Sequence, residues 1–240
     1  MTGIILAAGN GTRLKESSGE NCCKVLKKVN GISLIEFALN NLVELNVANV
    51  FIVVGLDGEL IKKTLGNIYK CLKITYIYQS EQIGLINALM QAIEVAESDD
   101  IILQLADEIF ISFRADEVRR ILSDDVLDFG CGITCEDDLQ KIKANYSIET
   151  DCNMVIEKCT EKPEHITNNL KGTGLCVFKK DVIDLLKEVY DKKNNTPNDL
   201  CDFVNCLVAE KRRGAAFCVA DKEFNINTIE DLTQAIEFLS

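Results

Sequence analysis

Three short, mostly apolar segments constrain the fold of this 240-residue chain more than any other feature. They are residues 4–8, 50–54 and 101–105. Segments of this length and composition are typical of strands buried on both faces. Amphipathic helical patterns separate them, at residues 33–46, 59–65 and 84–96. This alternation predicts an α/β fold with a doubly wound, mostly parallel sheet.

Two of the predicted helices begin with a capping box. Ser33 and Glu36 have the spacing at which each side chain bonds the other residue's backbone N–H. Thr228 and Asp231 repeat the pattern near the C-terminus, ahead of an apolar stripe at helical spacing. We therefore expect helix starts at both positions.

The middle of the chain changes character. Residues 128–178 contain short strand-like segments and turns without a long amphipathic helix, which predicts an antiparallel excursion. Helices are predicted again at 181–190 and 198–213, and a last strand at 215–220. With no repeat or linker in the sequence, we expect a single domain over residues 1–240. It would have two halves, residues 1–112 and 113–240.

Composition excludes several classes of function. The formal charge of −12 argues against nucleic acid or an anionic membrane as a partner. No apolar run reaches the length of a membrane span, and Met1-Thr2-Gly3 leads straight into a strand, so we expect neither an anchor nor a signal peptide. Eleven scattered cysteines, mostly without metal-type spacing, indicate buried or incidental thiols in a reducing cytoplasm.

A glycine-spaced loop follows the first predicted strand. Gly9 and Gly11 allow positive φ and close approach of a ligand to the backbone, and Arg13 would add a fork of donors. Backbone amides in such a loop can bind phosphate, although an ordinary tight turn explains the pattern as well. The dinucleotide fingerprint would need a third glycine where Leu14 stands, and no Gly-Lys-Ser/Thr of a Walker loop follows.

Further polar residues lie at predicted strand ends or in loops. Asp107 follows the strand at 101–105, at the edge of the sheet where ligands of such folds bind. By itself it could equally be a turn residue or a helix cap. The only histidine, His165, lies in a polar loop and is not a catalytic candidate.

Six short motifs occur in a particular order along the chain. They are Leu6-Ala7-Ala8-Gly9-Asn10-Gly11-Thr12-Arg13-Leu14, Lys24 ahead of Val29-Asn30-Gly31, Gln79 with Gly84, Leu105-Ala106-Asp107, Glu161-Lys162-Pro163 eleven residues before Thr173-Gly174, and Asn225-Ile226-Asn227. In this order they resemble the sugar-phosphate nucleotidylyltransferases. These enzymes join a nucleoside triphosphate to a phosphorylated small molecule and release pyrophosphate.

The resemblance covers nearly the whole chain and implies a Rossmann-like nucleotidyltransferase fold, with a role for each motif. Phosphate-contacting catalytic residues would be Arg13, Lys24 and Lys162. Nucleotide-binding residues would be Leu6, Ala7, Ala8, Gly9, Asn10, Gly11, Thr12, Arg13, Gln79 and Gly84. Acceptor-binding residues would be Tyr146, Ser147, Glu161, Lys162 and Thr173. The metal would be Mg²⁺, held by Asp107 and by Asn227 or Asn225.

The chemistry agrees with these residue types. Attack of an anionic phosphate on a triphosphate gathers negative charge, so catalysis is largely positioning and neutralisation. Mg²⁺ takes oxygen ligands and commonly uses few protein groups. No general base is needed, because the nucleophile is already an anion.

Three departures from the family pattern keep the function open. Cys23 replaces the proline before the lysine, Ala106 replaces a glycine, and Ser147 stands where many sugar-specific members have glycine. The leading hypothesis is transfer to a sugar 1-phosphate. The alternatives are a cytidylyltransferase for phosphocholine or a phosphonate, and a catalytically silent nucleotide-binding homologue.

Overall fold

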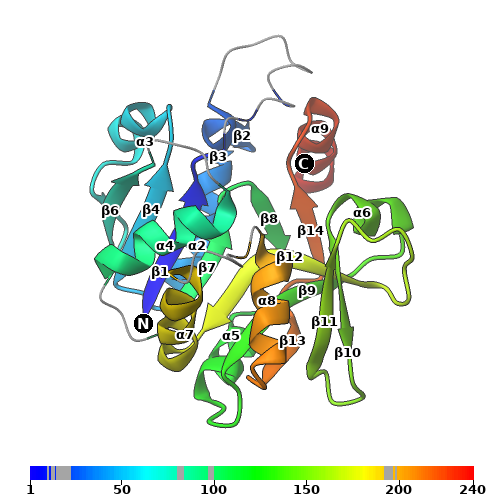
Figure 1. The fold of residues 1–240 in the computed structure, drawn as a ribbon. Coiled ribbons are helices and arrows are strands. Elements are labelled where there is room, and N and C mark those ends of the chain that lie inside the picture. The colour runs from blue at the N-terminus through cyan, green and yellow to red at the C-terminus, as the bar shows by residue number, and fades with distance from the viewer. Residues whose placement is uncertain are drawn as a thin grey trace.

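A computed structural model describes residues 1–9, 11, 14, 23–79, 84–96, 100–191, 197 and 199–240. In this part of the chain, a 10-stranded mixed sheet runs through the molecule in the order β11-β10-β12-β7-β1-β4-β6-β5, with β9 and β13 joined at β12 (Figure 1). Two small antiparallel pairs, β2–β3 and β8–β14, lie outside it.

Parallel pairing joins the central strands. These are β1 (Thr2–Ala7), β4 (Asn49–Val54), β6 (Leu72–Tyr78) and β7 (Ile101–Leu105). Short β5 (Ile68–Tyr69) pairs antiparallel with the start of β6. The apolar runs that predicted buried strands therefore form the centre of the sheet, and their C-terminal ends meet at one edge.

Antiparallel strands extend the sheet on the other side. They are β9 (Phe129–Cys135), β10 (Tyr146–Thr150), β11 (Ile156–Glu161) and β12 (Leu170–Phe178), with β13 (Gly214–Cys218) parallel to β9. The long strand β12 pairs with β7, β9 and β10, so it connects the excursion to the parallel part. The predicted α/β class with an antiparallel excursion is confirmed.

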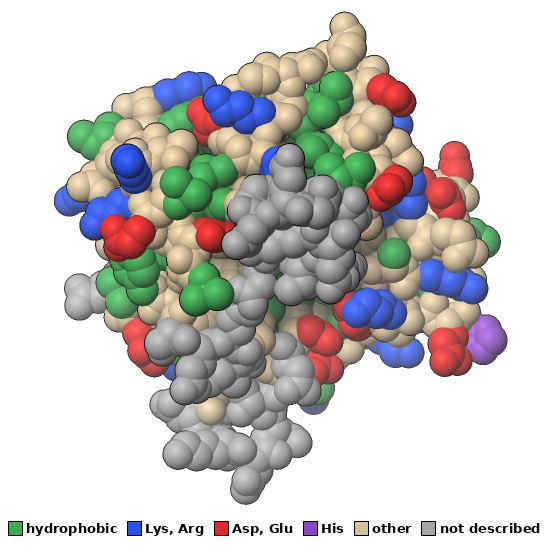
Figure 2. All heavy atoms as spheres, turned by 90° about the horizontal axis from the view of Figure 1, so that it is seen from above, with side chains coloured by type: hydrophobic (Ala, Val, Ile, Leu, Met, Phe, Trp, Pro, Cys, Tyr) green, Lys and Arg blue, Asp and Glu red, His purple; other side chains and the backbone are tan. Residues whose placement is uncertain are grey.

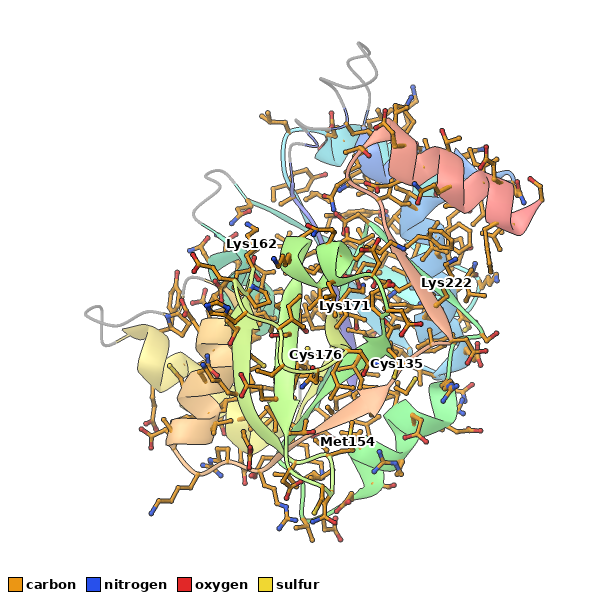
Figure 3. All side chains as sticks on the ribbon, turned by 90° about the vertical axis from the view of Figure 1, so that its right-hand side faces the viewer. Cys135, Met154, Lys162, Lys171, Cys176 and Lys222 are labelled. Atoms are coloured by element: carbon orange, nitrogen blue, oxygen red, sulfur yellow. The ribbon has the colours of Figure 1, made fainter. Side chains whose placement is uncertain are left out.

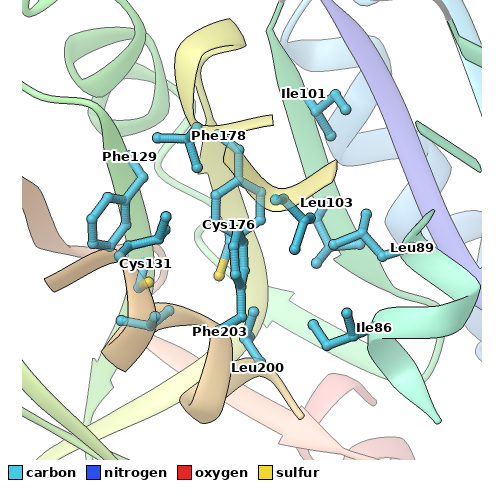
Figure 4. Close-up of a cluster of buried hydrophobic side chains, with 14 of the residues drawn as sticks. Ile86, Leu89, Ile101, Leu103, Phe129, Cys131, Cys176, Phe178, Leu200 and Phe203 are labelled. Carbon is cyan, nitrogen blue, oxygen red and sulfur yellow. The ribbon is translucent and has the colours of Figure 1, made fainter. Parts of the chain in front are cut away.

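Helices cover both faces of the sheet (Figure 1). On one face lie α4 (Leu85–Ala96), α7 (Lys180–Asp191) and α8 (Leu200–Ala209), and on the other α2 (Leu34–Glu44), α3 (Gly58–Leu65) and α5 (Ala115–Ser123). Each set packs its apolar stripe into a separate core cluster. Figure 4 shows the first cluster, in which the rings of Phe178 on β12 and Phe203 on α8 pack at a tilted angle, with their centroids 5.2 Å apart.

A third, smaller cluster supports the segment before the last helix. Here β8 (Glu108–Ile111) and β14 (Lys222–Asn225) pair beside β2 (Lys28–Val29), β3 (Ile32–Ser33) and α9 (Ile229–Leu239). The remaining short elements are the 3₁₀ turn η1 (Lys24–Leu26) and α6 (Leu139–Ala144). This cluster holds the turn after β7 beside the segment before α9. The predicted metal ligands lie in these two segments.

Both predicted capping boxes are confirmed. The Ser33 N–H and hydroxyl donate to Glu36 Oε2 at 2.8 and 2.6 Å. The Thr228 N–H donates to Asp231 Oδ2 at 2.8 Å, while Asp231 N–H donates to Thr228 Oγ1 at 3.2 Å. The sequence alone could predict these helix starts because the two side chains of a capping box bond the free backbone N–H groups at the helix N-terminus without distant partners.

Three element predictions were wrong in extent. The helix predicted over 33–46 ends at Glu44, and Asn46 adopts a left-handed φ of 57°. The helix predicted over 198–213 covers only Leu200–Ala209, after which Lys211 has a φ of 59°. Strand 215–220 is β13 and ends at Cys218, and it is not the last strand, because β14 follows.

The missed strand β14 has a physical explanation. Only one of its four residues, Phe224, is apolar, so they resemble a polar loop. Glu223 is nevertheless buried, because it forms an ion pair with Lys171 of β12. The strand is stabilised by an ion pair with a residue that is distant in sequence, so its own residues need not show an apolar pattern.

No helix among the described residues is long and apolar enough to cross a membrane. All ten cysteines in the described part are free thiols. Figure 2 looks onto the edge where the parallel strands end, and its described basic and acidic side chains are interspersed.

Candidate active site

A pocket of about 390 Å³ opens at the C-terminal ends of β1 and β7. It is lined by Leu6, Ala8, Gly9, Gln79, Gly84, Leu85, Ala88, Leu105 and Asp107. Five of the predicted nucleotide-binding residues therefore share one cavity with the predicted metal ligand. Asn10, Thr12 and Arg13 lie outside the described residues.

Gly11 lies beside Lys24 in a conformation that favours glycine. Its φ is +58°, and a Cβ placed there would come within 2.9 Å of the Lys24 Cβ. The loop can therefore pass this close to the lysine only without a side chain. Gly9, in contrast, has open space where its Cβ would be.

Gln79 is held in place at the rim of the pocket. Its N–H donates to the Val54 carbonyl at 2.8 Å, continuing the β4–β6 pairing. Its Nε2 donates to Asn87 Oδ1 on α4 at 3.0 Å, and Asn87 Nδ2 in turn donates to the Tyr190 hydroxyl of α7 at 2.5 Å. The side-chain amide is therefore oriented with its nitrogen toward α4.

Lys24 and Asn227 meet at Asp107, which is part of the pocket's lining. The Lys24 Nζ lies 2.6 Å from Asp107 Oδ2 and 3.2 Å from Asn227 Oδ1, although the latter residue is 203 positions away. The Lys24 side chain is only 10% exposed. The Lys24 ammonium group is thus held between oxygen atoms of two residues that are distant from each other in the sequence.

The backbone fixes this meeting point. Ile226 N–H donates to the Asp107 carbonyl at 2.9 Å, so the turn after β7 is tied to the segment before α9. Asn227 N–H donates to Asp231 Oδ2 at 2.9 Å, the same oxygen that caps α9. Asp107 and Asn227 are therefore set by the capping of a helix and by the β8–β14 pairing rather than by a flexible loop.

Asn225 and Asn145 extend these hydrogen bonds away from Lys24. Together with Asn227 they form a row of three asparagine side chains, the asparagine row. Asn227 Nδ2 donates to Asn225 Oδ1 at 2.8 Å, and Asn225 Nδ2 donates to Asn145 Oδ1 at 2.8 Å. Asn225 was a sequence-predicted metal ligand, whereas Asn145 was not singled out. Only its place immediately before the predicted Tyr146 could have drawn attention to it.

The structure places Lys162 at the end of β11, on the antiparallel excursion (Figure 3). Its side chain is 69% exposed and lies 3.6 Å from Glu161 Oε1. Its backbone has a φ of +43°, and its N–H donates to the Asn145 carbonyl at 2.7 Å. Burial raises the pKa of Glu161, and the neighbouring Lys162 opposes this shift. Lys162 is thus joined to the row through its backbone, while its ammonium remains accessible.

The other predicted acceptor residues are buried and already have partners. The Tyr146 hydroxyl donates to the Thr173 carbonyl at 2.6 Å, and the ring covers Gly172, where a Cβ would meet it at 2.0 Å. Thr173 Oγ1 donates to the Gly132 carbonyl at 3.0 Å. Ser147 is buried opposite Lys171 and Thr160. In this structure Tyr146 and Thr173 shape the wall through internal bonds, and their predicted contact with an acceptor stays a prediction.

Buried ionisable side chains lie behind Asp107. Both carboxylate oxygens of Glu108 accept from Gly174 N–H at 2.8 Å, which ties the turn after β7 to β12. Burial, reinforced by the Asp107 charge, raises the Glu108 pKa to about 8. Lys171 and Glu223 form a buried ion pair that joins β12 to β14. These three residues could not be identified from the sequence, because an isolated charged residue in a strand resembles a surface residue.

Relatives with known activities match most of the chain. A family model described as nucleotidyl transferase matches residues 2–240. A UTP–glucose-1-phosphate uridylyltransferase of Haloferax volcanii is 28% identical over 235 residues, which cover 98% of this chain and 95% of that protein. The bifunctional protein GlmU of Thermodesulfovibrio yellowstonii is 25% identical over 250 residues, and the match spans 98% of this chain but 51% of the relative.

Solved structures share the fold at lower identity. A Bacillus anthracis chain described as a glucose-1-phosphate thymidylyltransferase, in complex with a sucrose, has a TM-score of 0.87 at 19% identity and covers 99% of this chain. That match covers 95% of the Bacillus chain. A UDP-glucose pyrophosphorylase complexed with UDP-glucose has a TM-score of 0.83 at 20% identity, with 99% and 97% of the two chains covered. With the family model matching almost every residue, this chain belongs to the nucleotidyl transferase family.

Proposed function

We propose that this enzyme transfers a nucleotidyl group from a nucleoside triphosphate to a sugar 1-phosphate and releases pyrophosphate. The observation that carries the proposal is the convergence of Lys24 and Asn227 on Asp107, which lines the glycine-lined pocket. The uridylyltransferase of Haloferax volcanii, matched over almost its whole length, has a name that describes this reaction.

The reaction needs two phosphate groups held in line. An oxygen of the acceptor phosphate attacks the α-phosphorus, a new P–O bond forms, and the bond from the α-phosphorus to the bridging oxygen of the β-phosphate breaks. Pyrophosphate leaves with that oxygen. Because both reactants are anions, the principal task of the protein is to orient them and offset their charge.

The donor atoms on the wall fit a divalent cation. Asp107 Oδ2 and Asn227 Oδ1 already flank a cation, the Lys24 ammonium, and oxygen ligands are those Mg²⁺ prefers. No cluster of three His, Cys, Asp or Glu exists among the described residues, which accords with a site completed by phosphate oxygens and water. When bound, Mg²⁺ would neutralise charge developing on the α-phosphate.

Asn227, rather than Asn225, is the proposed ligand of the metal. Its Oδ1 faces the cation position, whereas Asn225 Oδ1 accepts the amide of Asn227. Asn225 therefore fixes which end of the Asn227 amide faces the cation.

Three basic residues are proposed to contact phosphate. Lys24 would move from Asp107 to the triphosphate when the metal binds, because both cations compete for the same oxygen atoms. Lys162, accessible on the other side of the asparagine row, would hold the acceptor phosphate. Arg13 keeps its proposed role beside the triphosphate. In this scheme residues 1–112 supply the nucleotide side of a single domain and residues 113–240 the acceptor side.

Gln79 favours a base that carries a ring N–H. Because its Nε2 donates to Asn87, its Oε1 is the atom suited to accept from that N–H. Uracil and thymine present such a group at N3 and guanine presents one at N1, whereas cytosine and adenine have acceptors at these positions. The name of the Haloferax volcanii uridylyltransferase favours the pyrimidines of this set, so we propose UTP or dTTP as the substrate.

The geometry of β10 supports a sugar acceptor over phosphocholine or a phosphonate. Successive side chains of a strand point to opposite faces. Tyr146 pairs across from Glu161, while Ser147 pairs across from Thr160 and Lys171. The Ser147 side chain therefore lies on the face away from Glu161, and it does not intrude where a sugar would bind Glu161.

Pyrophosphate release tests the proposal directly. UTP, dTTP, CTP, ATP and GTP would each be paired with hexose 1-phosphates, phosphocholine and a small phosphonate in the presence of Mg²⁺. We expect the largest kcat/KM with UTP or dTTP and a hexose 1-phosphate. The highest value with CTP and phosphocholine would overturn the substrate assignment, and no release with any pair would overturn the activity.

A further inference from the structure

We infer that Asn145 is a positioning residue. It orients the proposed metal ligand Asn227 through the side chain of Asn225, which is hydrogen-bonded to both, and it joins this ligand to the acceptor-binding segment. The inference rests on the proposed function. It goes beyond it by giving a role to a residue that touches neither metal nor substrate in that scheme.

The side-chain amides in the row all point the same way. Lys24 Nζ donates to Asn227 Oδ1, Asn227 Nδ2 to Asn225 Oδ1, and Asn225 Nδ2 to Asn145 Oδ1. Asn145 Nδ2 completes the row by donating to the Lys141 carbonyl of α6 at 2.8 Å. Every carbonyl oxygen thus faces the cation end and every NH₂ group faces α6.

Such an alignment has an electrostatic consequence. Hydrogen bonds arranged head to tail polarise one another, so each donor strengthens the negative end of the next amide. The row therefore directs an oxygen of increased negative potential at the cation without adding formal charge. A neutral ligand suits a site where two phosphate groups must approach each other.

Asn145 is the residue that fixes the direction of the row. Its Oδ1 is the acceptor for Asn225 Nδ2, and its own NH₂ is held by a helix carbonyl that can only accept. Without this acceptor, the Asn225 amide could rotate by half a turn and present NH₂ to Asn227. Asn227 would then lose the partner that keeps its oxygen on the cation.

Packing does not hold the row in place. A cavity of about 260 Å³ lies against it, and Asn145, Asn225 and Asn227 all belong to its lining. A side chain bordered by open space on one side can adopt other rotamers at little steric cost. Hydrogen bonds must therefore supply the orientation that neighbouring atoms do not.

The backbone of Asn145 reaches the acceptor side. Its carbonyl accepts from Lys162 N–H at 2.7 Å, at the left-handed turn that presents the Lys162 ammonium. Asn145 is thus hydrogen-bonded through its side chain to the metal-ligand segment and through its backbone to the proposed acceptor clamp. Asn145 therefore determines how the metal ligand Asn227 and the acceptor-binding Lys162 are placed relative to each other.

The test uses the full-length protein and Mn²⁺ alone as the probe. Asn145→Ala removes the acceptor for Asn225, and we expect Mn²⁺ binding, measured by electron paramagnetic resonance, to weaken about 3–10-fold, as for loss of a neutral hydrogen bond. We expect kcat to fall by a similar factor while the KM for the nucleoside triphosphate is unchanged.

Asn168→Ala is the matched control. Asn168 also makes two hydrogen bonds through its side chain, to the Ile148 carbonyl and from Leu170 N–H, in the same antiparallel excursion. Both variants should lose similar stability on denaturation, but only Asn145→Ala should lose Mn²⁺ affinity. Asn145→Asp keeps the accepting oxygen and should retain Mn²⁺ affinity at 0.5 M salt, where the added charge is largely screened.

The outcomes separate this inference from the proposed function. If wild-type protein binds Mn²⁺ and releases pyrophosphate but Asn145→Ala behaves as Asn168→Ala in Mn²⁺ affinity and kcat, the inference is overturned and the function stands. If Asn145→Asp binds Mn²⁺ as weakly as Asn145→Ala, the accepting oxygen is not the cause. If wild type neither binds Mn²⁺ nor releases pyrophosphate, the function itself fails.

Discussion

The two sides of the site are built in different ways. On the nucleotide side, the pocket is lined by small or apolar residues on the ends of parallel strands, such as Ala8, Gly9 and Leu105. On the acceptor side, the wall depends on amides and buried charges, such as Asn225 and the Lys171–Glu223 ion pair. The first presents backbone to a ligand, whereas the second orients individual side chains.

This difference follows from what each side has to recognise. A triphosphate has the same geometry in every nucleotide, so a fixed loop of backbone amides can bind it. The acceptor and the metal require particular atoms at particular angles, and these come from distant segments of the chain. The following predictions test whether the two sides respond differently to substitution.

The largest effect on stability is expected on the acceptor side. Lys171→Met would leave Glu223 as a buried charge without a partner, which costs roughly 3–5 kcal/mol of unfolding free energy. Lys171→Met combined with Glu223→Leu should recover most of that loss, because an apolar pair replaces the ion pair. Urea denaturation measures both, and a loss below about 1 kcal/mol in the single variant would mean that Glu223 gains another partner or protonates.

A smaller effect, confined to catalysis, is expected at Lys162. Lys162→Ala would remove a charge-assisted contact worth roughly 1.5–3 kcal/mol, so turnover on the acceptor should fall about 10–100-fold. Calorimetry should show unchanged binding of the nucleoside triphosphate. Lys158→Ala, an exposed lysine on the same strand, is the control. Weaker triphosphate binding with unchanged acceptor saturation would show that the two sides are assigned wrongly.

On the nucleotide side, backbone geometry should matter most. Gly11→Ala imposes a left-handed conformation on a residue with Cβ, at a cost of about 1–2 kcal/mol, and brings that Cβ against Lys24. Nucleotide affinity should therefore fall about 5–30-fold. Gly31→Ala carries a similar strain at a φ of +85° with open space around it, so it should lower stability and leave affinity unchanged. Equal nucleotide affinity in both variants would indicate an ordinary turn.

The smallest expected effect compares the two capping boxes. Ser33→Ala and Thr228→Ala should each lower stability by about 1 kcal/mol. Asp231, which caps α9 with Thr228, also accepts from Asn227 N–H. Thr228→Ala alone should therefore weaken Mn²⁺ binding a few-fold, and the same weakening in Ser33→Ala would attribute it to stability rather than to the site.

The same contrast explains which features the sequence could predict. Apolar runs such as β4 and local motifs such as Ser33–Glu36 are determined by neighbouring residues, so their elements could be placed correctly. The loop at Gly9 and Gly11 and the resemblance it carries are also local. The position of Asp107 at a strand end followed from the order of strands.

What the sequence could not show depends on long-range contacts. Strand β14 exists because Glu223 meets Lys171 of β12, and Asn145 matters because Asn225, 80 positions later in the sequence, lies beside it. Likewise, Asn225 and Asn227 could not be distinguished until their amide directions were known. Such partners leave no pattern within a window of neighbouring residues.

The central claim is that Asp107 and Asn227 hold the cation on which nucleotidyl transfer depends. Pyrophosphate release by Asp107→Ala, with UTP or dTTP and a hexose 1-phosphate, tests it most directly against Asp221→Ala, an exposed carboxylate paired with Arg114. Loss of a charged metal ligand should lower turnover by at least about 100-fold in a protein that remains folded at the assay temperature, while Asp221→Ala stays near wild type. If Asp107→Ala keeps about a tenth of wild-type turnover or more, the activation free energy has risen by about 1.4 kcal/mol or less. That result would contradict the account.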